Sequence, residues 1–149
     1  MSPTQCELCH SGSSNILVQK RRWRIIDAGE SMFPGFTRVI WNDHAREMTD
    51  LREDERNTLM QVVFRVEQVM RDILEPDKIN LASLGNMVAH VHWHIIPRWQ
   101  DDIAFPAPVW NAPSPDAQKS ALAGARAACV HGRLRDYHQA LSNAFDHEP

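Results

Sequence analysis

The sequence predicts an α+β fold with a mainly antiparallel sheet, one long helix and a C-terminal helical segment, because strand-like runs lie on both sides of one helical pattern. Runs rich in β-branched and aromatic residues mark the expected strands, at residues 16–18, 23–27, 37–41, 79–84 and 88–96. The chain has 149 residues, which is the size of one domain. We therefore expect a single domain over residues 1–149, with its core at about 6–100.

The first three strands are expected to form a sheet before the helix begins. Ile16-Leu17-Val18 and Trp23–Asp27 lie close enough along the chain to pair as a hairpin. Pro34-Gly35 is a turn signal that leads into the third run.

The long helix is expected between Leu51 and Leu74, where apolar residues recur at every third or fourth position. They are Leu59, Val62, Val63, Val66, Val69, Met70, Ile73 and Leu74. This spacing places them on one helix face that can be buried. Asp50 and Glu53 resemble a capping pair, and Pro76 would end the helix.

The C-terminal third has a different composition. Residues 97–115 contain five prolines and two tryptophans, which predict an extended, irregular arm. In residues 116–145 alanine and apolar residues return at helical spacing, so we expect one or two helices, with Ser114 as the cap.

Charge and hydrophobicity exclude several classes of partner. Sixteen Lys and Arg against nineteen Asp and Glu give a net charge of −3, so no basic field exists to hold duplex nucleic acid. No run reaches the roughly 18 apolar residues of a membrane span, and the first residues lack the pattern of a secretory signal. We expect a cytoplasmic protein with no membrane partner.

Eight histidines are many for this length, and three of them alternate along one expected strand. His90, His92 and His94 share one face, while the apolar residues between them take the other face. The three span about 13 Å, so one metal ion is not easily bound by all of them from a straight strand. A neutral imidazole is a nucleophile at pH 7, and the central His92 is the natural candidate.

This alternating pattern resembles the motif of the histidine-triad (HIT) superfamily of nucleotide hydrolases and transferases. Pro97-Arg98-Trp99 looks like the continuation found in the branch that cleaves dinucleoside polyphosphates. The resemblance extends upstream through Pro34-Gly35, Asp50-Leu51 and Gly85-Asn86, and covers about residues 6–100. Trp93 departs from it, because many relatives carry a small apolar residue between the second and third histidines.

The resemblance implies a role for each of several residues. His92 would attack the α-phosphate and become nucleotidylated, and His94 would contact the phosphate oxygens. Asp27 would bind the ribose hydroxyls, and Asn80 and Asn86 would be polar contacts near the phosphates.

Cys6 and Cys9 offer two thiolates at a spacing that suits tetrahedral zinc. His44 and His90 would complete the set, which resembles the structural zinc site of zinc-bearing HIT proteins and of galactose-1-phosphate uridylyltransferases. Such a zinc ion would orient the strand and take no part in catalysis. Two alternatives remain open at this point: His10 replaces His44, or both cysteines are metal-free thiols.

The favoured function is therefore hydrolysis of a dinucleoside polyphosphate, such as diadenosine tetraphosphate, at the α-phosphate through a nucleotidyl-histidine. The alternatives are a nucleoside phosphoramidate hydrolase, a non-catalytic nucleotide-binding sensor, and a metal-binding protein that uses the histidines as ligands. Family members commonly pair, so the resemblance also implies a homodimer.

Overall fold

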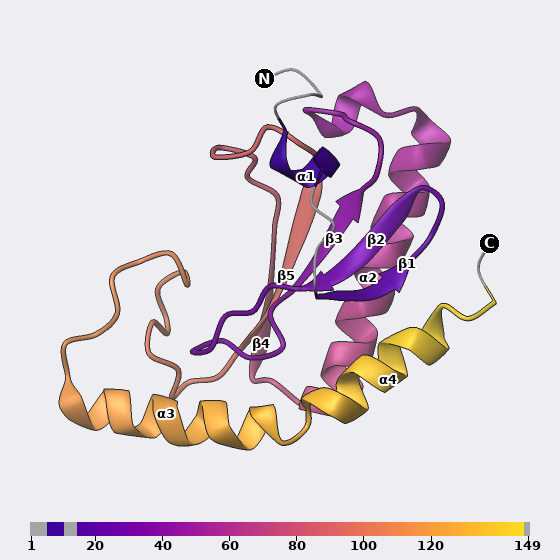
Figure 1. The fold of residues 1–149 in the computed structure, drawn as a ribbon. Helices are drawn as coiled ribbons and strands as arrows, with labels where there is room; N and C mark the ends of the chain where they lie inside the picture. The colour runs from indigo at the N-terminus through magenta and orange to yellow at the C-terminus, as the bar shows by residue number, and fades with distance from the viewer. Residues whose placement is uncertain (1–5, 11–14, 148–149) are drawn as a thin grey trace.

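The structure is a computed structural model that describes residues 6–10 and 15–147 (Figure 1). In this part of the chain an antiparallel sheet has the strand order β1-β2-β3-β5-β4. The strands are β1 (Ile16–Gln19), β2 (Trp23–Asp27), β3 (Thr37–Trp41), β4 (Lys78–Ala82) and β5 (His92–Arg98). With the helices, this arrangement confirms the predicted α+β fold.

The helices are α1 (Glu7–His10), α2 (Glu53–Leu74), α3 (Ala117–His131) and α4 (Leu134–Ala144). The expected stripe of α2 is buried from Leu59 to Leu74, apart from the partly buried Ile73. Figure 1 shows α2 and α4 on the same side of the sheet, where Tyr137 of α4 is hydrogen-bonded to Thr37 of β3 at 2.9 Å. Among the described residues, none of the helices has the length and apolarity that a bilayer span requires.

Strand register decides which residues face the helices. Thr37, Val39 and Trp41 of β3 pair with the odd-numbered residues of β2, and most of these side chains join the core beneath α2 and α4. Because side chains alternate, the even-numbered residues of β3 and β5 point to the other face. That face carries His92 and His94.

Several predicted boundaries are wrong by a few residues; the fourth strand, for example, ends at Ala82 instead of Leu84. The helix begins at Glu53, because the Asp50 carboxylate already accepts hydrogen bonds from the Arg46 and Glu47 amides and ends a short 3₁₀ turn, Met48–Asp50. The fifth strand begins at His92 instead of Val88, and residues 83–91 form a loop with Gly85 at a φ of 67°.

The C-terminal segment forms two helices, as expected, but Asp116 caps α3 in place of Ser114. The Asp116 side chain accepts hydrogen bonds from the Gln118 and Lys119 amides. Ser114 lies two residues earlier, where its hydroxyl accepts from the Asp116 amide.

The proline-rich arm is tied to the end of β5 by Arg98, which is only 2% exposed. The Arg98 guanidinium donates to both carboxylate oxygens of Asp102, at 2.7 and 3.1 Å, and to the Ala107 carbonyl. Asp102 in turn accepts from the Ala104 and Phe105 amides. This group of contacts, which we call the Arg98 anchor, fixes the start of the arm.

Candidate active site

His92 and His94 lie side by side on the face of β5 that points away from α2. Their Nε2 atoms are 3.1 Å apart, and both side chains are buried. His92 Nδ1 lies 2.7 Å from the His90 carbonyl oxygen, which can only accept, so Nδ1 carries the proton. In the neutral ring, Nε2 of His92 then holds a free lone pair. The contact between the rings assigns a proton to His94 Nε2, which donates to that lone pair.

Burial keeps both imidazoles neutral. It lowers the pKa of His92, and the positive charge of Arg38 lowers that pKa further. For His94, burial lowers the pKa to about 4, helped by the neighbouring His92 and Arg38. A neutral pair of this kind presents one nucleophilic nitrogen and one hydrogen-bond donor at the same point.

The low pKa of His94 predicts that the fold loses stability in mild acid. Between pH 6.5 and pH 4 an unfolded His94 takes up a proton while the folded one does not, so stability falls as pH drops through this window. The full loss is about 3 kcal/mol, since one pKa unit corresponds to about 1.4 kcal/mol. Urea unfolding of the wild type and of His94→Gln at several pH values measures it. The difference in the free energy of unfolding between the two proteins should change by about that amount toward pH 4. A difference that stays the same at every pH would contradict the low pKa of His94.

A cavity of about 530 Å³ opens onto the two histidines. Its lining residues are Glu7, Leu8, Arg38, Leu84, Gly85, Asn86, Met87, Val88, His92, His94 and Trp110. They come from α1, β3, the loop before β5, β5 itself and the arm. The Trp110 ring lies edge-on to His94 with 5.3 Å between centroids, and it is half exposed. The arm therefore supplies one wall of the cavity.

Only some of the predicted contact residues line the cavity. Asn86 lines the cavity, as a phosphate or sugar contact would require. Asn80 does not line it, because its side-chain oxygen accepts a 2.8 Å hydrogen bond from Arg98. Its side chain thus contacts the Arg98 anchor from the neighbouring strand β4.

Asp27 is also absent from the lining. It pairs in register with Thr37 on the helix-covered side, and its carboxylate lies 3.3 Å from His138 of α4 and accepts from the Gly29 amide. The His138 contact lowers the Asp27 pKa. Asp27 thus lies outside the lining of this cavity, and the ribose contact that the resemblance implies for it stays a prediction.

Trp93 leaves the cavity open despite its size. It takes the core-facing position between the histidines, where it packs against the main core and its Nε1–H donates to the Met48 sulfur at 3.4 Å.

Sequence reasoning missed Arg38 and Trp110 as lining residues. Neither the strand register nor the path of the arm can be read from the local pattern around them.

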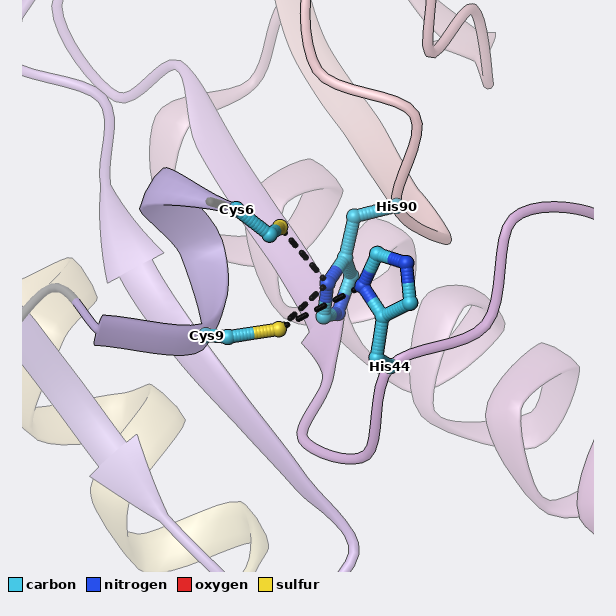
Figure 2. A group of neighbouring side chains, drawn as sticks. All are labelled: Cys6, Cys9, His44 and His90. Atoms are coloured by element: carbon cyan, nitrogen blue, oxygen red, sulfur yellow. Dashed lines mark hydrogen bonds between the residues drawn. The ribbon is translucent and has the colours of Figure 1, made fainter. Parts of the chain in front are cut away.

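Cys6, Cys9, His44 and His90 meet just before the start of β5 (Figure 2), and their ligand atoms all lie within 4.8 Å of one another. His90 Nδ1 is 3.3 Å from the Cys6 sulfur and 3.5 Å from the Cys9 sulfur, and His44 Nδ1 is 3.4 Å from Cys9. A tetrahedral zinc ion with ordinary bond lengths would set these nitrogen–sulfur distances at about 3.5 Å. The four residues form a group that could hold a metal ion.

The surroundings of this group suit that role. Nε2 of His90 donates to the Trp41 carbonyl at 2.6 Å, which leaves Nδ1 unprotonated and directed at the sulfurs. His10, the alternative to His44, instead donates from Nδ1 to the Cys6 carbonyl at 3.0 Å and lies outside the group.

Solved structures share this fold. A histidine triad protein from Bradyrhizobium japonicum is 25% identical, with a TM-score of 0.66 and coverage of 87% of this chain and 88% of that chain. A histidine triad protein from Marinobacter aquaeolei is 27% identical, with a TM-score of 0.61 and coverage of 80% and 89%. A zinc-bound histidine triad family protein from Mycobacterium smegmatis is 20% identical, with a TM-score of 0.57 and coverage of 88% and 99%, and shows the fold alone.

Curated relatives are more distant. An uncharacterized HIT-like protein from Saccharolobus solfataricus is 30% identical over 74 residues, which are 46% of this chain and 53% of that protein. An AP-4-A phosphorylase from Mycobacterium tuberculosis is 27% identical over 78 residues, 48% of this chain and 40% of that protein. The chain thus matches about half of the length of these relatives, or less. The family model described as "HIT domain" matches residues 11–101, more than half of the chain, and the protein belongs to the HIT domain family.

Proposed function

We propose that the protein is a nucleotide hydrolase that cleaves dinucleoside polyphosphates at the α-phosphate through a covalent intermediate on His92. The observation that carries this proposal is the geometry of the two histidines, with His92 Nδ1 at the His90 carbonyl and the two Nε2 atoms 3.1 Å apart, and the protonation pattern follows from it. His92 points an unprotonated Nε2 at the cavity beside the Nε2–H of His94. A nucleophile and a donor for developing negative charge thus act at one point.

The reaction would proceed in two balanced steps. His92 Nε2 forms a bond to the α-phosphorus while the bond from that phosphorus to the bridging oxygen breaks, and the remaining nucleotide leaves with the bridging oxygen. The His94 Nε2–H stabilises the phosphoryl oxygens as their charge grows. Water then attacks the same phosphorus, the bond to His92 breaks, and the nucleoside monophosphate is released with a proton lost to solvent.

The rest of the cavity supports a nucleotide ligand. Leu84, Met87 and Val88 form an apolar wall with Trp110, and a purine base is a flat apolar group that such a wall can bind. The relatives named AP-4-A phosphorylase carry a dinucleoside polyphosphate in their name, which favours this substrate class.

Product analysis tests the proposal. The protein is incubated with diadenosine tri-, tetra- and pentaphosphate and with adenosine phosphoramidate, and the products are separated by chromatography. AMP release from the polyphosphates at a rate above that from the phosphoramidate is the expected result. Preferential cleavage of the phosphoramidate would assign the other hydrolase class, and tight AMP binding without any cleavage would assign a sensor.

For the metal group we propose a structural zinc site formed by Cys6, Cys9, His44 and His90. The soft thiolates and imidazoles form a donor set that zinc prefers, and closed four-ligand sites are structural. Bound zinc would hold α1 against the loop before β5 and take no part in the reaction. None of the three cysteines forms a disulfide, and reducing compartments keep cysteines in this state, so we also propose a cytoplasmic location.

We also propose that the protein forms a homodimer, as the family resemblance implies. Light scattering coupled to size-exclusion chromatography at micromolar concentration should give about twice the chain mass of 17.1 kDa. A monomer mass under these conditions would contradict the proposal.

A further inference from the structure

The cavity contains one permanently cationic side chain, and the family motif does not account for it. Among the described lining residues only Arg38 carries a fixed positive charge, and only Glu7 is acidic. Arg38 lies on β3 directly opposite His94 of β5, on the same face as both histidines. Its guanidinium therefore lies next to the reaction centre.

Arg38 has no anionic partner within the described part of the chain. Several other arginines of the fold are paired with acids, among them Arg98 with Asp102, Arg126 with Asp101 and Arg133 with Glu75. Arg38 instead has a buried Nε without a hydrogen-bond partner among these residues, and it lies over the Phe36 ring at 5.7 Å. A half-buried guanidinium without a counter-charge is costly, and an anionic ligand in the cavity removes that cost.

A second unpartnered group belongs to the residue that pairs in register with Arg38. His94 Nδ1 is buried and has no hydrogen-bond partner among the described residues, although its Nε2 contacts His92. The two unpaired groups, on Arg38 and His94, belong to neighbouring residues of adjacent strands. The guanidinium fork matches the geometry of phosphate oxygens, whereas His94 Nδ1, which is unprotonated when Nε2 carries the proton, can only accept a hydrogen bond from the ligand.

We propose that Arg38 is a specificity-determining residue that binds a phosphate beyond the one attacked by His92, and so selects substrates with a polyphosphate leaving group. This inference rests on the proposed function. The α-phosphate lies between His92 and His94, and the next phosphate lies beside His94 at Arg38. A phosphoramidate has no such second phosphate, so its cleavage needs no contact between Arg38 and a phosphate.

The experiment compares wild type with Arg38→Gln, Arg38→Lys and the control Arg65→Gln. Arg65 is exposed on α2, on the opposite side of the sheet, and its substitution makes the same change in charge. For diadenosine tetraphosphate, kcat/KM should fall by about 30-fold or more in Arg38→Gln, as expected when one partner of a buried charge pair is removed. For adenosine phosphoramidate the fall should stay below about threefold, since no second phosphate contacts Arg38. Arg38→Lys should restore part of the loss, and Arg65→Gln should match the wild type.

Equal losses on both substrates, or no loss on the polyphosphate, would overturn the proposal. If the wild type cleaves neither compound, the proposed function fails, but calorimetry of nucleotide binding still tests the role of Arg38. In that case, Arg38→Gln should still reduce the affinity for ADP more than the affinity for AMP. An unchanged ratio of the two affinities would overturn the role of Arg38. Thermal unfolding of Arg38→Gln should show an equal or higher Tm, because the variant removes an unpaired half-buried charge.

Discussion

Replacement of His92 by alanine should lower turnover of diadenosine tetraphosphate by at least about 10³-fold, because it removes the atom that forms the covalent intermediate. The loss should appear in kcat, with nucleotide binding largely retained. Within the described part of the chain, the hydrogen bonds of the His92 side chain join it to the His90 carbonyl and the His94 ring. Initial rates and AMP affinity, measured on the same preparation, check both expectations.

His131→Ala is the matched control, since that histidine is exposed on α3, where its ring donates to the Ala127 carbonyl. It should turn over substrate at the wild-type rate. A second observation identifies the intermediate itself. Wild-type protein quenched during turnover should carry one added nucleotidyl group on the peptide that contains His92. Retained turnover in His92→Ala would remove this residue from the role of nucleophile.

Replacement of Cys6 and Cys9 by serine should abolish metal binding and weaken substrate binding together. Protein purified without added metal should contain about one equivalent of zinc, and the double variant should contain almost none. Glu7 and Leu8 lie between the two cysteines and line the cavity. Without the metal, α1 would no longer be held in place as a wall of the cavity. Substrate binding should therefore weaken, and KM should rise by more than kcat falls.

Elemental analysis, a thermal unfolding curve and the two kinetic constants measure these effects. Cys129→Ser is the control, because Cys129 is exposed on α3 and far from the group in the chain. It should keep both the metal and the wild-type Tm. Wild-type protein without metal, or a double variant that retains it, would contradict the proposed site.

The sequence predicted what depends on local spacing. Alternation along one strand was enough to place His92 and His94 on the same face, and the structure brings both rings to one cavity. The resemblance also named Cys6, Cys9, His44 and His90 together, and the structure gathers these four residues. The apolar spacing of α2 similarly predicted the face that is buried.

What the sequence did not predict depends on pairing between distant segments. Arg38 and Asp27 occupy opposite faces only because of the register between β2, β3 and β5, which no local pattern reveals. Asn80 was expected near phosphates, but Arg98 from the adjacent strand uses its side chain. Trp110 reaches the cavity through an irregular arm whose path is set by the Arg98 anchor.

The Arg98 anchor also sets apart a short loop that can vary independently of β5. The arm is fixed at its start by Asp102 and Ala107 and at its end by the capped first turn of α3. Residues 108–115 span the gap between these fixed points, and they carry Trp110 to the cavity without supplying a catalytic atom. Such a segment can change in length and sequence while the strand that holds His92 keeps its position. A change in this loop would therefore alter the cavity wall at Trp110 and leave the histidines of β5 in place.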